Sequence, residues 1–459
     1  MINSMSCLGY RGFSTKETLN LAIPNGKPGS GLTILVGPNG GGKSTLVECF
    51  YQLSLAKAYN NSVSFSRGKR NFKAGDIVEI SINFDGASGV LSTRNGGSQA
   101  QWSGQQLPDI YYLPSRRFFN PFFSMMPWDR ETYLRNQRSN QFRSSSLDQY
   151  TSRLIDLNSK GPRQFNEVLG RILGEQIEWT IDQDDNAQYL VKITKKNGLS
   201  HNSDGLGEGV LSLMFIVDPL CGEDNQTVVI DEPEMSLHPQ LQMRLLREIL
   251  ERTRKSQVVI STHSPNMISL EAIANGAMVA RVFDDGDGSK ICPIDEPSRQ
   301  FVASTIGDIC NPHILGLDAR SCFFAEDGII ITEGQEDVVL YPVILKGLHK
   351  NYSIPFFGFG AGGASSIRKV AHLLSHLGFK RIGAIFDGDK EEEYKKFNEE
   401  FSQAGYKAWM IPADDIRCKK AIPEKPPVDG LLAEDRKTLK DEYVGKMSMI
   451  LDEINDFLE

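Results

Sequence analysis

The sequence has few cysteines, and none of them forms a metal-type or disulfide-type pair. Seven cysteines are scattered through 459 residues, never in a Cys-x-x-Cys arrangement. An odd, dispersed set of this kind excludes a cysteine zinc site and a disulfide framework. It is typical of reduced thiols, so we expect a cytoplasmic protein.

Long hydrophobic runs are also absent. The most apolar candidate helix, residues 210–220, contains Ser212 and Asp218 and is too short for a bilayer core about 30 Å thick. Residues 1–11 lack a cationic start followed by an apolar run and a small-residue cleavage site. We therefore expect neither a membrane span nor secretion.

The chain has no excess of positive charge. It carries 50 Lys and Arg against 58 Asp and Glu, a net charge of −8, which argues against a protein that coats nucleic acid through bulk charge. A local basic groove is still compatible with this balance. The 40% hydrophobic and 24% charged content excludes disorder and suits two or three globular cores.

A glycine-rich loop between a predicted strand and a predicted helix is the most specific motif. Residues 32–36 form an apolar run typical of a buried strand, and Gly-x-x-x-x-Gly-Lys-Ser follows at residues 37–44. In such loops backbone N–H groups close on phosphates, Lys43 faces the β- and γ-phosphates, and Ser44 ligates Mg²⁺. The predicted ATP-binding residues are Asn39, Gly40, Gly41, Gly42, Lys43, Ser44 and Thr45.

An acidic pair follows another apolar strand. Residues 227–230 lead directly into Asp231 and Glu232. At the end of a buried strand beside the phosphate loop, Asp231 would hold Mg²⁺, directly or through water. Glu232 would act as general base for the attacking water.

Together these segments resemble ABC-type ATPases, and more narrowly their DNA-repair and SMC-like branch. The resemblance implies that Ser-Leu-His-Pro at 236–239 is the D-loop and that His263 contacts the γ-phosphate. It also implies a signature loop at 202–212, in which Ser203 and Gly205 touch ATP bound by a second chain. One phosphate loop and one signature per chain imply a homodimer or higher homo-oligomer. The Q-loop glutamine is expected among Gln99, Gln101, Gln105 and Gln106.

Residues 115–175 are polar and predict a helical insertion. Between residues 116 and 143, aromatic residues are interleaved with six arginines, namely Arg116, Arg117, Arg130, Arg135, Arg138 and Arg143. This mixture suits phosphate contact and base stacking. The alternative is a solvated helical arm whose aromatic residues pack on a partner.

The composition and pattern change again after the ATPase motifs. Residues 1–295 are predicted to be the ATPase domain, residues 296–325 a linker, and residues 326–459 a second domain with alternating strands and helices. Strands are predicted at 328–332, 354–359, 381–386 and 407–411, and a last helix within 432–458. The predicted class is α/β, an ABC-type ATPase head followed by a Rossmann-like domain.

Acidic residues follow two strands of this second domain. Glu333 and Asp337 follow the first strand, and Asp387 and Asp389 follow the third. Since ligands gather at the carboxyl ends of parallel strands, these carboxylates should converge. Convergent carboxylates repel one another unless cations lie between them, and oxygen ligands suit Mg²⁺ or Mn²⁺. Such ions activate water and stabilise a phosphodiester leaving group.

Glu-Gly-x-x-Asp followed by Asp-x-Asp on an α/β unit resembles the Toprim domain of topoisomerases, primases and certain nucleases. The resemblance implies that Glu333 is the catalytic glutamate, as metal ligand or base. Asp337, Asp387 and Asp389 would be metal ligands, with Glu336 as an alternative to Asp337.

An ABC-like ATPase followed by a Toprim unit resembles the OLD (overcoming lysogenisation defect) family of ATP-dependent nucleases. The resemblance implies an Mg²⁺-dependent endonuclease of bacterial anti-phage defence that cleaves nucleic acid, with DNA the expected substrate. It also suggests that Lys419 neutralises the scissile phosphate and leaves room for a further defence protein or RNA partner. Two alternatives stay open: a nucleic-acid-sensing ATPase with a vestigial Toprim scaffold that regulates an effector, and a Toprim ribonuclease acting on tRNA.

Overall fold

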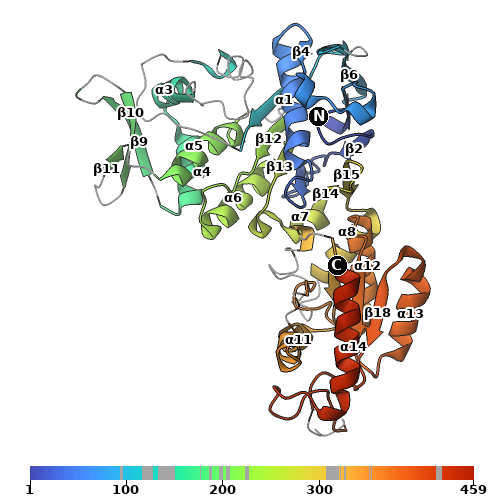
Figure 1. Cartoon of the computed structure of the whole chain (residues 1–459). Coiled ribbons are helices and arrows are strands. Elements are labelled where there is room, and N and C mark those ends of the chain that lie inside the picture. Colours follow the sequence, from blue (N-terminus) through green and yellow to red (C-terminus); the bar gives the residue numbers. More distant parts are fainter. Residues whose placement is uncertain are drawn as a thin grey trace. The chain divides into compact units, whose positions relative to one another are not determined.

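The chain divides into two compact units, Met1–Ile291 and Cys292–Glu459, both of α/β architecture as predicted (Figure 1). The computed structural model describes residues 1–93, 97–115, 128–132, 150–175, 177–183, 185, 189–195, 200–202, 207–222, 227–306, 320, 322–324, 327–350, 352, 354–419 and 426–459. Among these residues, no helix combines the length and apolar character needed to cross a membrane.

A six-stranded sheet carries the phosphate loop in the first unit. Its order is β15-β14-β3-β13-β12-β8, and the five strands from β14 to β8 run parallel. The strands are β3 (Leu32–Val36), β8 (Ile110–Leu113), β12 (Thr227–Asp231), β13 (Val258–Ser261), β14 (Met278–Asp284) and β15 (Ser289–Pro293). Every residue of β3, β12 and β13 is buried, which explains their nearly continuous aliphatic sequence.

An antiparallel sheet of order β2-β1-β5-β6-β7-β4 completes the ATPase core. Its strands are β1 (Ile2–Leu8), β2 (Glu17–Asn20), β4 (Ser62–Ser64), β5 (Glu79–Phe84), β6 (Ala87–Thr93) and β7 (Gln99–Gly104). Helix α1 (Lys43–Ala58) contacts β12 and β13 of the parallel sheet and β4 of the antiparallel sheet. It is buried without a break from Thr45 to Ala56, as a helix enclosed on all sides must be.

The predicted insertion contains two helices within the described residues, α3 (Tyr150–Lys160) and α4 (Arg163–Leu173). Helix α4 packs against α5 (Glu208–Leu220) and α6 (Pro239–Arg252). A buried ion pair of 3.0 Å joins Arg153 on α3 to Asp218 on α5. The other elements of this unit are α7 (Leu270–Asn275), β9 (Ile177–Gln183), β10 (Tyr189–Lys195), β11 (Ser200–Asn202) and the 3-10 turns η1 (Arg67–Lys69), η2 (Phe72–Ala74) and η3 (Pro265–Met267).

The second unit is built on three parallel strands in the order β16-β17-β18. Their bounds are Ile329–Ile331, Ile382–Phe386 and Lys407–Met410. The helices are α8 (Glu296–Ile306), α11 (Gln335–Gly347), α12 (Ala364–His376), α13 (Glu391–Phe401) and α14 (Asp441–Leu458), with the 3-10 turns η4 (Cys322–Phe324) and η5 (Ser402–Ala404). A core that includes Ile330, Ile344, Ile385 and Leu451 holds α11 and α14 against this sheet.

Two segments of the second unit differ from the prediction. The predicted strand at 354–359 is reduced to a single parallel bridge between Ile330 and Phe356. The extended segment does not continue past this bridge because the next residues turn the chain away from a strand conformation. Four glycines with positive φ lie there, namely Gly358, Gly360, Gly362 and Gly363. Within the predicted linker at 296–325, α8 is a regular helix that packs against α12 of the same unit.

Candidate functional site

The loop between β3 and α1 lines a cavity of about 800 Å³. Its wall is formed by Arg11, Asn39, Gly40, Gly42, Lys43, Ser44, Thr45, Ser115, Glu232, Met235 and His263. Gly41, predicted with the loop, is not among them. A Cβ at Gly37 would lie 2.3 Å from the Val282 carbonyl oxygen, and one at Gly41 would lie 2.4 Å from the same atom. Both positions therefore need glycine for the loop to lie against β14.

Lys43 is held over this loop by two carbonyl oxygens. Its Nζ donates to the oxygens of Gly37 and Pro38, each at 2.9 Å. Burial lowers the pKa of Lys43 to about 8, against the opposing effect of Glu232 and Asp231. A bound phosphate would favour the charged ammonium, which matches the predicted role of this side chain.

Adjacent parallel strands bring the catalytic candidates of the ATP site together. Asp231, buried at the end of β12, accepts a hydrogen bond from Ser261 Oγ at the end of β13. Glu232 follows in the left-handed region with φ 49°, a strained conformation for a residue other than glycine. Its N–H donates to the Ser261 carbonyl at 3.0 Å, and its Oε1 lies 3.8 Å from His263 Nε2.

A third acid supports the histidine of this site. Glu234 Oε1 accepts a hydrogen bond of 2.6 Å from the His263 N–H, and burial raises the pKa of Glu234. Burial, followed by the positive charge of Lys43, lowers the pKa of His263, so its imidazole is neutral near pH 7. The sequence reasoning missed Glu234, although the run Asp-Glu-Pro-Glu at 231–234 displays it.

Two further residues of the cavity wall come from segments that contain no recognised motif. Arg11 reaches it from the turn after β1, and Ser115 from the end of β8. The four glutamines proposed for the Q-loop do not line the cavity; Gln99 instead donates to Ser62 Oγ at 3.1 Å.

Ser203 and Gly205 lie outside the described residues, as do five of the six arginines of the insertion. The sixth, Arg130, stacks over the Tyr111 ring at 5.9 Å.

The second unit holds a separate acidic cavity of about 320 Å³. Its wall is formed by Glu333, Gly334, Gln335, Glu336, Asp337, Gly362, Gly363, Asp387, Asp415, Arg417 and Lys419. Glu333 follows β16, Asp337 lies in the first turn of α11, and Asp387 follows β17. The Asp387 N–H donates to Glu333 Oε1 at 3.1 Å, which ties the ends of the two strands together.

The acids of this cavity are poorly solvated and repel one another. Burial, opposed in part by hydrogen bonds, raises the pKa of Glu333 to about 7 and that of Asp337 to about 6. Burial first, then the charges of Asp337 and Glu333, raises the pKa of Asp387 to about 9. A divalent cation in the cavity would relieve both effects.

One acid of the predicted site lies outside the cavity wall, and one acid that was not predicted lies in it. Asp389 does not line the cavity; it is half-exposed and pairs with Lys390 at 2.6 Å. Asp415, which the sequence reasoning did not assign, lines the cavity and is buried. It pairs with Lys419, the predicted phosphate-neutralising residue, which also lines the cavity.

Glu336 and Asp337, the two alternatives for one predicted metal ligand, have different partners. Glu336 forms an ion pair of 3.0 Å with Arg417. Asp337 is buried and accepts a hydrogen bond from the Gly334 N–H at 2.9 Å. Both side chains line the cavity, and, in addition to burial, the charge of Asp337 raises the pKa values of Glu333 and Asp387.

The donor set of the acidic cavity suits Mg²⁺, although it is not a closed cage. In the part of the chain that the structure describes, no three His, Cys, Asp or Glu side chains are already arranged around a metal position. Mg²⁺ keeps several waters and is usually held by one or two carboxylates together with substrate phosphates. Buried oxygen ligands with raised pKa values fit this mode of binding.

Part of the first unit matches a known protein family. Residues 108–269 match the family described as "AAA domain, putative AbiEii toxin, Type IV TA system", a span that includes Asp231, Glu232 and His263. Among solved structures, the SMC head domain of Thermotoga maritima has 15% sequence identity and a TM-score of 0.38, with 64% of this chain and 99% of that chain covered.

Three curated proteins are similar in sequence. Septu protein PtuA of Bacillus thuringiensis is 23% identical over 338 residues, 64% of this chain and 81% of that protein. Old nuclease of Escherichia phage P2 is 26% identical over 196 residues, 42% of this chain and 29% of that protein. OLD nuclease of Thermus scotoductus is 24% identical over 315 residues, 55% of this chain and 59% of that protein.

This chain therefore spans less than two thirds of either OLD nuclease in these alignments. The assignment of residues 326–459 to a Toprim domain stays a prediction. Over the aligned parts of the chain, these relatives confirm the predicted resemblance to OLD-family ATPase nucleases.

Proposed function

We propose that this chain is an OLD-type, ATP-hydrolysing endonuclease of bacterial anti-phage defence, with its ATPase in residues 1–295 and an Mg²⁺-dependent nuclease centre in residues 326–459. The observation that carries the proposal is the presence of two separate sets of catalytic groups. One is the phosphate-loop cavity with Lys43 and Glu232, and the other is the half-buried pair Glu333 and Asp387 beyond the ends of β16 and β17. Sequence relatives named nucleases support the second role.

In the first unit, the chain would bind ATP and orient water. Backbone N–H groups of the loop and the Lys43 ammonium would hold the β- and γ-phosphates, while Ser44 and Asp231 would hold Mg²⁺. Glu232 would accept the proton of the attacking water. His263, neutral near pH 7, would contact the γ-phosphate, and Glu234 would fix its backbone.

In the second unit, Glu333, Asp337 and Asp387 would hold Mg²⁺, which when bound activates water and stabilises the leaving oxygen of a phosphodiester. Asp389 is a less favourable ligand because it pairs with Lys390 outside the cavity wall. Lys419 and Arg417 line the same cavity. We assign them to the scissile phosphate, with Asp415 holding Lys419 in place.

We further propose that ATP acts by joining two chains. Each chain supplies one phosphate loop and one signature segment at 202–212, so a complete pair of ATP sites requires a homodimer. ATP would then shift the equilibrium by contacts that exist only in the closed dimer. Nucleic acid would bind to the arginine-rich segment at 116–143, and a further defence protein or an RNA would be an additional partner.

Removal of divalent metal tests the nuclease proposal. Purified protein is incubated with plasmid DNA, or with tRNA in a parallel arm, in the presence of ATP. We expect cleavage with Mg²⁺, a loss of roughly a hundredfold or more in excess EDTA, and recovery on adding Mg²⁺ back. The arm that is cut identifies the substrate class.

A protein that hydrolyses ATP but cleaves no nucleic acid would contradict the nuclease proposal. Intact ATP hydrolysis without cleavage of any nucleic acid, under Mg²⁺ and Mn²⁺, would favour an ATPase with a vestigial Toprim scaffold that regulates an effector. The observation that favours this second candidate is the lack of a preformed three-ligand metal group among the described residues.

Gly360 provides a test confined to the second unit. It has φ +88°, and a Cβ there would lie 2.7 Å from backbone atoms of Gly334, next to Glu333. We expect Gly360→Ala to lower cleavage by roughly tenfold to a hundredfold because the acidic loop must move, with ATP hydrolysis unchanged. Gly347→Ala is the control, since nothing lies within 4 Å of its added Cβ. Equal cleavage by both variants would contradict the proposed centre.

A further inference from the structure

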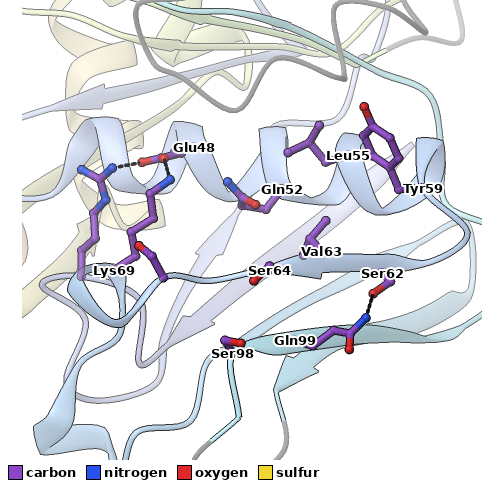
Figure 2. A pocket seen from close by; sticks show the side chains of 12 residues that line it. Glu48, Gln52, Leu55, Tyr59, Ser62, Val63, Ser64, Lys69, Ser98 and Gln99 are labelled. Atoms are coloured by element: carbon purple, nitrogen blue, oxygen red, sulfur yellow. Dashed lines mark hydrogen bonds and ion pairs between the residues drawn. The ribbon is translucent and has the colours of Figure 1, made fainter.

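A second large cavity of the first unit lies along α1 (Figure 2). Its volume is about 890 Å³. Glu48, Gln52, Leu55 and Tyr59 line it from α1, since residues three and four apart share one helix face. The opposite wall, from β4, the start of β7 and the turn around η1, contributes mainly serine hydroxyls. Arg11 is the residue that this cavity shares with the wall of the ATP cavity.

One end of the cavity is cationic. Arg11 Nη2 lies 2.7 Å from Glu48 Oε2, and Lys69 Nζ lies 3.2 Å from Glu48 Oε1 (Figure 2). Two cations against one buried carboxylate leave a net positive charge. The Arg11 and Lys69 side chains are still 32% and 30% exposed, and Arg11 Nε has no hydrogen-bond acceptor among the residues that the structure describes. This end suits an anionic group such as a phosphate.

The middle of the cavity is lined by the side-chain amide of Gln52. Gln52 is 4% exposed, and within the described residues its side chain makes no hydrogen bond. Its amide atoms are not among the fully buried side-chain atoms that lack a partner, so they are accessible from the cavity and can hydrogen-bond to a ligand there. A carboxamide offers a donor and an acceptor side by side, the pairing that a nucleobase edge can satisfy.

The other end of the cavity is apolar and aromatic. Leu55 and Val63 are buried, whereas Tyr59 is 47% exposed. From Glu48 to Tyr59 the helix rises about 16 Å. Along this length the wall changes from cationic to amide to apolar, which matches the order of phosphate, ribose and base in a nucleotide.

We propose that this cavity is a second ligand site, separate from the phosphate loop, that binds a nucleotide. Arg11 and Lys69 hold its phosphate, Gln52 bonds the polar edge of its base or sugar, and Leu55 and Val63 cover the base. Arg11 also lines the ATP cavity, so a ligand bound at one site changes the environment of a residue that lines the other. The site does not depend on the nuclease assignment.

Calorimetric titration of AMP into the full chain tests this site. The background variant is Lys43→Ala, which weakens phosphate binding at the ATP loop. We expect AMP to bind, with Gln52→Leu raising Kd by about fivefold and Lys69→Gln by about tenfold. Adenosine and inorganic phosphate, titrated separately, should each bind more weakly than AMP.

Two controls separate ligand binding from folding. Lys57→Gln removes the same charge from α1 at a residue that does not line the cavity and should leave Kd unchanged. Gln52→Leu should not lower the melting temperature, because its amide has no partner to lose. Absence of AMP binding, binding that Gln52→Leu and Lys69→Gln leave unchanged, or phosphate binding as tight as that of AMP would each overturn the proposal.

Discussion

Asp387→Asn is expected to lower the rate of nucleic-acid cleavage by roughly a hundredfold or more, with ATP hydrolysis unchanged. Asn keeps the shape of the side chain but removes the charged oxygen that would bind Mg²⁺. The loss should persist at saturating Mg²⁺ if the carboxylate supports catalysis as well as affinity. Cleavage of labelled substrate over a range of Mg²⁺ concentrations measures both effects.

The same variant, although less active, should be more stable to unfolding than the unsubstituted protein. The folded-state pKa of Asp387 is raised to about 9 from an ordinary value of 3.8, by burial first and then by Asp337 and Glu333. Between these values the folded protein retains a proton that the unfolded chain releases, so this residue lowers stability as pH rises from about 4 to 9. Asp387→Asn removes that effect, and we expect a higher melting temperature at pH 8 in EDTA.

A matched variant guards against general effects of lost charge. Asp414 is exposed and does not line the acidic cavity, so Asp414→Asn should retain full cleavage and an unchanged melting temperature. Cleavage by Asp387→Asn equal to that by Asp414→Asn would sink the assignment of the nuclease centre.

The sequence predicts those parts of the site whose geometry is determined by residues close to them in the chain or by the order of the strands. The phosphate loop is defined by glycine spacing between an apolar strand and a helix, and the structure has β3 and α1 at those places. The meeting of Glu333 and Asp387 follows from parallel strand order, because each residue lies within two positions of the end of a strand of the same sheet.

The parts that it does not predict depend on packing between distant segments. Asp415 and Arg11 enter their cavities from turns with no motif of their own. Asp389 has the expected spacing, but an ion pair with the next residue, Lys390, decides the direction of its side chain. The cavity beside Gln52 exists because α1 is covered by a different sheet from the one that holds the phosphate loop.

Glu232→Gln is expected to lower the turnover number for ATP hydrolysis by about a thousandfold while preserving ATP binding. Gln keeps the left-handed backbone and the volume of the side chain but cannot accept the proton of water. It also removes a negative charge near the γ-phosphate, so ATP affinity should stay equal or increase. A hydrolysis assay together with equilibrium binding of ATP separates the two quantities.

The same variant tests the proposed dimer. With hydrolysis blocked, ATP should hold two chains together, and light scattering should record a doubled mass with ATP and Mg²⁺ but not with ADP. Glu234→Gln is the control, because an amide oxygen can still accept the His263 N–H and burial already favours the neutral acid there. It should retain hydrolysis to within about fivefold. If both substitutions abolish hydrolysis equally, Glu232 supports the shape of the loop rather than proton transfer.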